Sequence, residues 1–326
     1  MRSPFLAIFM AALLITSMAL SQEKYALVIH GGAGVISPKA MTESRRVSYR
    51  EKLNEALTRG DELLQRGVPA TEVVVNVIQI LEDSPLFNAG KGAVFTHEGV
   101  NELDASIMEG KNLNAGAVAG VRDIKNPIKA AREVMENSKH VLLSGNGASE
   151  FARRQRLEMV KNTYFYTPER FKSLQQLQKK ERERTGKDDT GTVGCVALDQ
   201  QGNICAGTST GGMTNKKYGR IGDSPIIGAG TYADNNTCGV SCTGHGEYYI
   251  RLGFARDISA LMEYQHLSIA AACRQELEKL EKLGGSGGVV GLDKNGNIAM
   301  EFNTNGMFRG FVKSNGEKEI AIFKNH

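Results

Sequence analysis

The sequence predicts an α+β protein in which sheets pack on sheets and helices lie outside them. Strand-like pairs and helix-like pairs come in separate blocks in both halves of the 326 residues. A regular alternation of single strands and helices would instead indicate a doubly wound parallel sheet. Hydrophobic residues make up 41% of the chain, which is enough for one large core or two ordinary ones.

The first block begins with a strand and continues with two helices. KYALVIHGGAG (24–34) is a short apolar run that ends in a glycine turn. Helical spacing of apolar residues then predicts helices over 41–66 and 71–81. The other elements expected in this half are short strands between turns over 87–110 and 113–121, a helix from Asn126-Pro127 through Met135, and a capped helix over 145–154.

Strand character returns after a polar segment. From Arg153 to Asp189 the chain is rich in Lys, Arg, Glu and Gln, which predicts a solvated helix, a linker (about 154–191), or both in turn, with a mobile tail near the end. From 192 to 210 the pattern is strand, turn, strand. The remaining expected elements are a strand over 237–244, helices over 247–264 and 268–283, a hairpin over 287–302 that turns at Asn295-Gly296, and a strand over 319–323.

Residues 1–21 are expected to be a secretory signal peptide. Arg2 precedes an apolar run over 5–15, and Ala19 and Ser21 form a small-x-small cleavage pattern. The alternative is a membrane anchor, for which the run is short. We therefore expect an exported protein, periplasmic or secreted, with no membrane contact after signal removal.

Composition argues against several other classes. The net charge is +4, part of it from the polar segment, and there is no tryptophan, so no nucleic-acid partner is expected. Buried free thiols are expected for the cysteines in strand-like stretches, and no second ligand pair supports zinc. All five cysteines follow Gly191: Cys195, Cys205, Cys238, Cys242 and Cys273.

Two familiar catalytic patterns are weak here. HGGAG (30–34) lacks the glycine spacing of a dinucleotide loop and the lysine of a P-loop, so a simple turn is the preferred interpretation. A Ser-His-Asp hydrolase is not supported, because there is no G-x-S-x-G motif and His30, His97 and His245 have no recognisable local partners.

The junction between Gly191 and Thr192 is more informative. A buried-type strand starts at Thr192, directly behind a hydrophilic segment. A threonine hydroxyl needs a base, and an N-terminal threonine carries one in its own α-amine, whose reference pKa is about 7.7–8.0. That amine exists only if the preceding bond is broken, and Gly191 presents no Cβ to crowd attack on its carbonyl. The sequence therefore predicts cleavage between Gly191 and Thr192.

Long motifs in both halves carry a resemblance to a known family. They are HGGAG, PLFNAGKGAVFT, ELDASIMEG, GTVGCVALD, TSTGGMTNKKYGRIGDSPIIGAGTYAD, SCTGHGE and FNTNGMFRG. Together they resemble the plant-type L-asparaginase / isoaspartyl peptidase family of N-terminal-nucleophile (Ntn) hydrolases, from Lys24 onward. The resemblance implies a four-layer αββα sandwich, self-cleavage into an α-subunit (22–191) and a β-subunit (192–326), and an (αβ)2 dimer.

The resemblance also implies residue roles. Thr192 would be the nucleophile, Thr210 its hydrogen-bonding partner, and Asn88 the group that orients the α-amine of Thr192. Without the flanking motifs, Thr210 would pass for a strand threonine and Asn88 for a turn residue.

Four further residues are implied to bind substrate. Arg220 and Asp223 would grip the α-carboxylate and α-amine of an aspartyl group, since a guanidinium fork binds a carboxylate bidentately. Thr243 and Gly244 would form the oxyanion hole. The alternatives are an ordinary surface ion pair for Arg220 and Asp223, and a strand threonine for Thr243.

A structural sodium ion is a softer implication, and no cofactor is expected for catalysis. LEDSPLFNAGKG resembles the family's sodium loop, although Lys91 brings a positive charge close to it. The main-chain ligands would come from Leu81, Glu82, Ser84, Phe87, Ala89 and Lys91.

The expected reaction is hydrolysis of β-aspartyl dipeptides and L-asparagine through a β-aspartyl ester on Thr192. A glycosylasparaginase of the same fold is one alternative. An exported, uncleaved aspartyl-binding protein is another, from a different functional class.

Overall fold

The computed structural model describes residues 24–34, 36, 38, 41–182 and 191–324. The expected signal peptide and the expected mobile tail over 183–190 lie outside these residues. In the part of the chain that is described, no helix combines the length and the apolar character needed to cross a bilayer.

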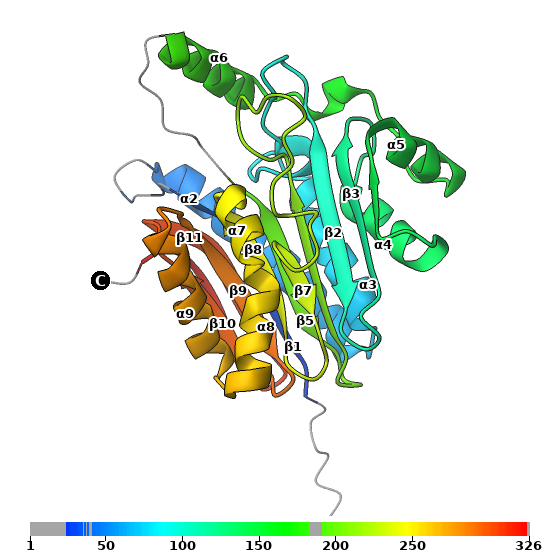
Figure 1. The fold of residues 1–326 in the computed structure, drawn as a ribbon, viewed down its shortest axis with the longest axis vertical. Helices are drawn as coiled ribbons and strands as arrows, with labels where there is room; N and C mark the ends of the chain where they lie inside the picture. Colours follow the sequence, from blue (N-terminus) through cyan, green and yellow to red (C-terminus); the bar gives the residue numbers. More distant parts are fainter. Residues whose placement is uncertain (1–23, 35, 37, 39–40, 183–190, 325–326) are drawn as a thin grey trace, which may run out of the picture.

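Eight strands form one large sheet in the order β12-β11-β1-β5-β6-β2-β3-β4 (Figure 1). Only β3 and β4 pair in parallel within it. The strands are β1 (Ala26–Gly34), β2 (Leu103–Glu109), β3 (Ala115–Val121), β4 (Leu142–Ser144), β5 (Val193–Leu198), β6 (Ile204–Thr210), β11 (Gly306–Lys313) and β12 (Lys318–Phe323).

A second, antiparallel sheet of four strands has the order β10-β9-β8-β7. These strands are β7 (Thr231–Ala233), β8 (Cys238–Gly244), β9 (Gly287–Asp293) and β10 (Ile298–Phe302). Side chains of Val28 and Val196 from the large sheet share an apolar cluster with Val240 and Leu292 of the second. The two sheets therefore pack face to face.

Helices cover the outer faces of the sheets (Figure 1). Leu27 and Ile29, which alternate with Val28 along β1, join the apolar cluster formed with the helices of the N-terminal half. The helices are α2 (Glu43–Gln65), α3 (Ala70–Glu82), α4 (Pro127–Asn137), α5 (Gly145–Arg154), α6 (Pro168–Arg182), α7 (Gly246–Leu252), α8 (Phe254–Gln265) and α9 (Ile269–Lys282), with 3-10 turns η1 (Gly90–Gly92) and η2 (Asn162–Phe165). Helices α8 and α9 pack on the second sheet. The α+β prediction is confirmed.

The structure corrects two local expectations. The helix predicted over 247–264 is two helices, because Gly253 between them adopts a left-handed φ of 59°. Much of the range 87–110 is turn and 3-10 structure, with one regular strand, β2, near its end. Strands β4, β7 and β11 were not predicted.

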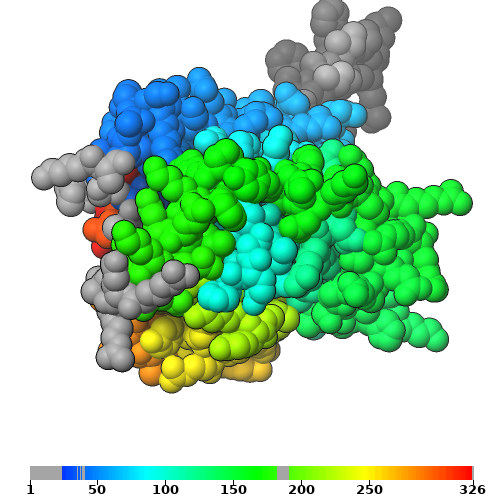
Figure 2. All heavy atoms as spheres, turned by 90° about the horizontal axis from the view of Figure 1, so that it is seen from above, coloured from blue at the N-terminus to red at the C-terminus, as the bar shows by residue number. Residues whose placement is uncertain are grey.

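The polar segment contains a helix that packs on the body of the protein. Leu174 and Leu177 of α6 are buried. The Phe171 and Phe95 rings pack edge to face, with 5.4 Å between their centroids. Figure 2 shows this part of the chain on the surface beside the residues around 95. The five cysteines are buried, as predicted for the four in strand-like stretches.

Candidate active site

Thr192 stands at the start of β5, in the middle of the large sheet. Its side chain is 5% exposed, and its hydroxyl donates to the carbonyl oxygen of Gly191 at 2.7 Å. The Thr210 hydroxyl, at the end of the neighbouring strand β6, lies 3.2 Å from the Thr192 hydroxyl. The chain runs uncut through this junction, so these contacts describe the state before any cleavage.

The Gly191 carbonyl oxygen accepts two further hydrogen bonds. Asn88 Nδ2 donates to it at 2.8 Å and Thr210 Oγ1 at 3.0 Å. The amide of Asn88 is itself fixed, because Nδ2 also donates to the Gly212 carbonyl and Oδ1 accepts from the Val94 N–H. In the uncut chain Asn88 therefore contacts the carbonyl side of the junction, whereas its expected partner was the amine of Thr192.

The glycines of HGGAG allow a close approach to this junction. Gly32 has a φ of 108°, and a Cβ there would lie 3.2 Å from the Thr192 nitrogen and 3.3 Å from Gly191 Cα. A Cβ on Gly31 would lie 2.4 Å from the Phe87 ring. The turn predicted at this motif was wrong: residues 30–34 are the end of strand β1, with a register shift between His30 and Ala33, and they pack against the predicted cleavage site.

A small cavity of about 10 Å³ lies at the junction. This volume holds about one water molecule, so the uncut site has no room for an amino acid. Its lining residues are Gly191, Thr192, Thr210, Gly212, Arg220, Gly222, Asp223, Ser224 and Gly244.

Arg220 reaches the cavity with a partner that the sequence did not reveal. Its Nε and Nη2 donate to the two carboxylate oxygens of Glu247 at 2.8 and 2.9 Å. Glu247 is half exposed, in the first turn of α7. The sequence feature that could have indicated Glu247 is its position in the motif SCTGHGE, four residues after Thr243. A substrate carboxylate must share this guanidinium with Glu247 or displace it.

Asp223 is a buried carboxyl group in the same cavity wall. Burial raises its pKa to about 7, and the positive charge of Arg220 acts in the opposite direction. Its Oδ2 has no hydrogen-bond partner among the described residues. A group that brings an ammonium to this oxygen would supply the missing partner.

The predicted oxyanion residues lie at the end of β8. Gly244 lines the cavity, whereas Thr243 lies one residue behind it. The Thr243 side chain is fully buried, and its oxygen accepts from the Ala33 N–H at 3.4 Å. Among the described residues, none accepts the Thr243 hydroxyl proton, which can therefore donate to a substrate oxygen. The structure brings all seven predicted catalytic and substrate-binding residues to one end of the sheets.

The expected sodium loop follows α3 and turns back on itself. A Cβ on Gly90 would lie 2.3 Å from the Glu82 carbonyl oxygen, and one on Gly92 would lie 2.0 Å from the Phe87 carbonyl oxygen. The Lys91 ammonium lies 5.6 Å from the centre of the Tyr164 ring, in a cation–π contact. The described residues contain no group of three or more His, Cys, Asp or Glu side chains that could hold a metal.

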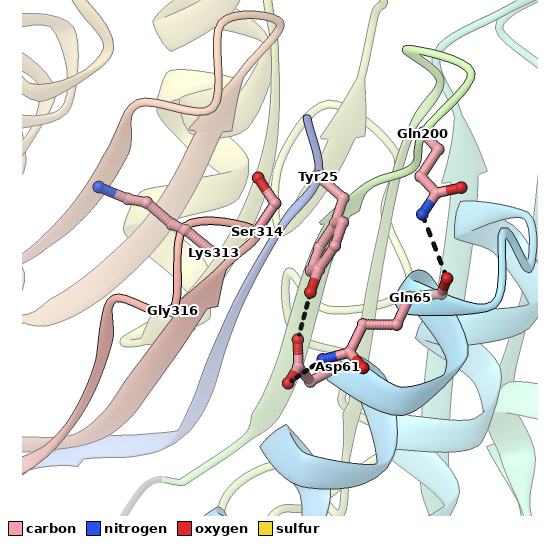
Figure 3. Close-up of a pocket in the computed structure, with 7 residues that line it drawn as sticks. All are labelled: Tyr25, Asp61, Gln65, Gln200, Lys313, Ser314 and Gly316. Carbon is pink, nitrogen blue, oxygen red and sulfur yellow. Dashed lines mark hydrogen bonds between the residues drawn. The ribbon is translucent and has the colours of Figure 1, made fainter. Parts of the chain in front are cut away.

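A larger cavity, of about 360 Å³, lies at the other end of β1 (Figure 3). Its polar groups bond to one another: the Tyr25 hydroxyl and the Gln65 amide both donate to the Asp61 carboxylate, at 2.8 and 2.9 Å. Such mutual satisfaction leaves little polar capacity for a ligand.

These features are those of a hydrolase that uses an N-terminal threonine. Comparison with known proteins agrees. Residues 23–322 match the family model described as asparaginase. The chain is 48% identical to an isoaspartyl peptidase of Escherichia coli (strain K12) over 310 residues, covering 92% of this chain and 97% of the relative. It is 42% identical to a plant-type L-asparaginase of Pyrococcus furiosus (90% and 98% covered) and 40% identical to a mouse isoaspartyl peptidase/L-asparaginase (91% and 90% covered). The chain belongs to the asparaginase family.

Proposed function

We propose that the protein is an amidohydrolase of β-aspartyl dipeptides and L-asparagine that activates itself by cleavage at Gly191–Thr192. The observation that carries the proposal is the hydroxyl of Thr192, held 2.7 Å from the oxygen of the adjacent peptide bond at the start of a central strand. The names of its relatives support the substrate class.

Self-cleavage begins with attack of Thr192 Oγ1 on the Gly191 carbonyl carbon. The C–N bond breaks, the nitrogen takes up the hydroxyl proton, and the acyl group rests on Oγ1 as an ester. The Asn88 and Thr210 donors stabilise the charge that develops on the carbonyl oxygen. Water then hydrolyses the ester, which leaves a Gly191 carboxylate and a free Thr192 amine and hydroxyl.

Substrate hydrolysis repeats this chemistry with a new acyl group. The Thr192 amine accepts the proton of Oγ1 as the hydroxyl attacks the side-chain carbonyl of the substrate. Arg220 binds the α-carboxylate, Asp223 the α-ammonium, and the oxyanion lies at Thr243 and the Gly244 N–H. Ammonia or an amino acid leaves with the proton, and water resolves the β-aspartyl ester. The leaving group points away from these contacts, which explains how one site accepts both substrates.

The experiment that tests this function compares three substrates with the purified protein. We expect release of amino acid from a β-aspartyl dipeptide and of ammonia from L-asparagine, and little reaction with N-acetylglucosaminyl-asparagine. Preference for the sugar substrate would support a glycosylasparaginase instead. Binding of aspartate without turnover of any substrate would support the non-catalytic binding protein.

We also propose the wider organisation that accompanies this function. Helices on both outer faces of two packed sheets support a four-layer αββα sandwich. Cleavage would give an α-subunit (22–191) and a β-subunit (192–326), paired as an (αβ)2 dimer. Export to the periplasm or medium rests on the pattern of residues 1–21.

A structural sodium ion in the loop after α3 is the last part of the proposal. The close packing of the Glu82 and Phe87 carbonyl oxygens against Gly90 and Gly92 supports it, and Leu81, Ser84, Ala89 and Lys91 would be further main-chain ligands. We expect a melting temperature about 2–4 °C higher in sodium chloride than in choline chloride of equal ionic strength, since a ligand of the folded state stabilises it by about 1 kcal/mol here. Equal melting temperatures in the two salts would exclude the ion. Lys91→Gln should keep this dependence on sodium, because the main-chain carbonyl is retained and the Lys91 ammonium lies at the Tyr164 ring.

A further inference from the structure

Five fully buried polar side chains link the two sheets in an unbroken hydrogen-bonded series. The distances between successive side-chain atoms are 2.9, 2.7, 2.6 and 2.7 Å. The members, which we call the inter-sheet relay, are His30 (β1), Ser241 (β8), Thr208 (β6), Thr231 (β7) and Ser106 (β2). Nothing in the proposed reaction uses them directly.

The relay ends beside two different parts of the active site. At one end, His30 lies against the backbone of Thr192, although burial outweighs this contact and lowers the histidine pKa to about 3. At the other end, the Ser106 hydroxyl donates to the Ser224 carbonyl at 2.6 Å, next to Asp223. Ser241, the member bonded to His30, lies two residues before Thr243 on the same face of β8.

Gly194 of β5 leaves the space that two members of the relay occupy. A Cβ on Gly194 would lie 2.0 Å from Ser241 Oγ and 2.2 Å from His30 Nε2. Any side chain at this position, two residues after Thr192, would separate the two sheets or break the contact. This geometry explains the second glycine of GTVG without any role in turn formation.

A polar series beside the apolar cluster that joins the two sheets is not needed for stability alone. Buried hydroxyls contribute little net free energy when bonded and cost more when one partner is lost, whereas apolar side chains of similar size pack equally well. Directional bonds between strands do, however, fix their register and orientation more narrowly than apolar contacts. The relay therefore has the properties of a positioning device.

We propose that the inter-sheet relay positions the two substrate-contacting segments relative to Thr192. Ser241 sets Thr243 and Gly244 through β8, and Ser106 sets Asp223 through the Ser224 carbonyl. The inference rests on the proposed function. Its members are positioning residues, since none lines the cavity at the junction.

The two arms predict different kinetic effects, which a purely structural role would not produce. Ser241→Ala disturbs the oxyanion side, so we expect kcat to fall about tenfold with KM within about twofold. Ser106→Ala disturbs the Asp223 side, so we expect KM to rise about tenfold with kcat within about twofold. Ser259→Ala is the matched control, because Ser259 makes a buried 2.7 Å hydrogen bond to Thr237 at the far end of β8.

The measurements are kcat, KM and melting temperature for the wild type and the three variants with a β-aspartyl dipeptide. The expected split, with Ser259→Ala unchanged in both constants, supports the relay. Equal changes in all three variants, or unchanged constants in both relay variants, overturn it while the proposed function stands. A wild type that turns over no substrate overturns both.

A variant that does not fold is replaced by a milder one. Thr208→Val keeps the side-chain volume and removes the hydroxyl that lies between the two arms. We expect it to lower kcat and raise KM together. If kcat and KM of Thr208→Val equal those of the wild type, the inference is wrong.

Discussion

Thr192→Ala is expected to leave a single uncut chain and to lower hydrolysis by at least about 10³-fold. The wild type should separate into two chains, of which the smaller begins at Thr192. The variant lacks the hydroxyl that residue 192 places 2.7 Å from the scissile carbonyl oxygen, and without cleavage there is neither a free amine nor room for substrate in the cavity. Intact-mass analysis with N-terminal sequencing measures cleavage, and a β-aspartyl dipeptide assay measures turnover.

Thr192→Ser is the matched control for this experiment. It retains a hydroxyl and is expected to cleave, more slowly, at the same bond. Cleavage of Thr192→Ala at Gly191 would show that another group performs the attack. A wild type that stays whole and yet hydrolyses substrate would contradict the N-terminal amine as the base.

Asp223→Asn is expected to lose activity and to gain stability at alkaline pH. The pKa of Asp223 is about 7 in the folded protein and near its ordinary value of 3.8 when unfolded. Because the folded state binds this proton more tightly, the contribution of Asp223 to the wild-type free energy of unfolding falls as pH rises from about 4 to about 7 and is then constant. The penalty above pH 7 is of order 4 kcal/mol or less. The asparagine of the variant carries no charge, so the variant does not lose this free energy of unfolding.

The activity of Asp223→Asn should fall about 10²-fold or more in kcat/KM, since the α-ammonium loses its carboxylate. Wild-type kcat/KM should rise with pH up to about 7, because below its pKa the Asp223 carboxyl is neutral and cannot pair with the α-ammonium. Thermal unfolding at pH 5 and pH 8 tests the stability claim. Asp293→Asn is the control, because the Asp293 carboxylate accepts from the Asn295 and Asn297 N–H groups in the β9–β10 turn and should gain nothing. A variant no more stable than wild type at pH 8 would contradict the buried-charge argument.

The sequence allowed the class and most elements to be predicted because local signals were strong. The strand at 24–34, the long helices α2 and α3, and the hairpin at Asn295-Gly296 each depend on residues close together in the chain. Strand β11 was missed because its glycines and Arg309 interrupt the apolar pattern, and its stability comes from pairing with β1. The break at Gly253 depends on a left-handed residue that helical periodicity does not reveal.

The candidate site was predicted through motifs, and its contacts were not. The ion pair between Glu247 and Arg220 and the hydrogen bond from Asn88 to the Gly191 carbonyl are tertiary contacts. The sequence shows no partner for His30, because its partner Ser241 lies 211 residues away in the chain. A single sequence gives no means of pairing such residues, since spacing carries no information over that distance.

The order of strands in the large sheet has a consequence for how the gene can be organised. Strand β1, from before the junction, lies between β11 and β5, from after it, while β5 and β6 lie between β1 and β2. Neither segment contains the complete large sheet, so two separately translated pieces would each expose unpaired strand edges prone to aggregation. Synthesis as a single polypeptide avoids this, because the covalent link makes association of the two pieces depend on loop closure instead of concentration. We expect co-expression of residues 22–191 and 192–326 as two genes to yield mostly insoluble protein.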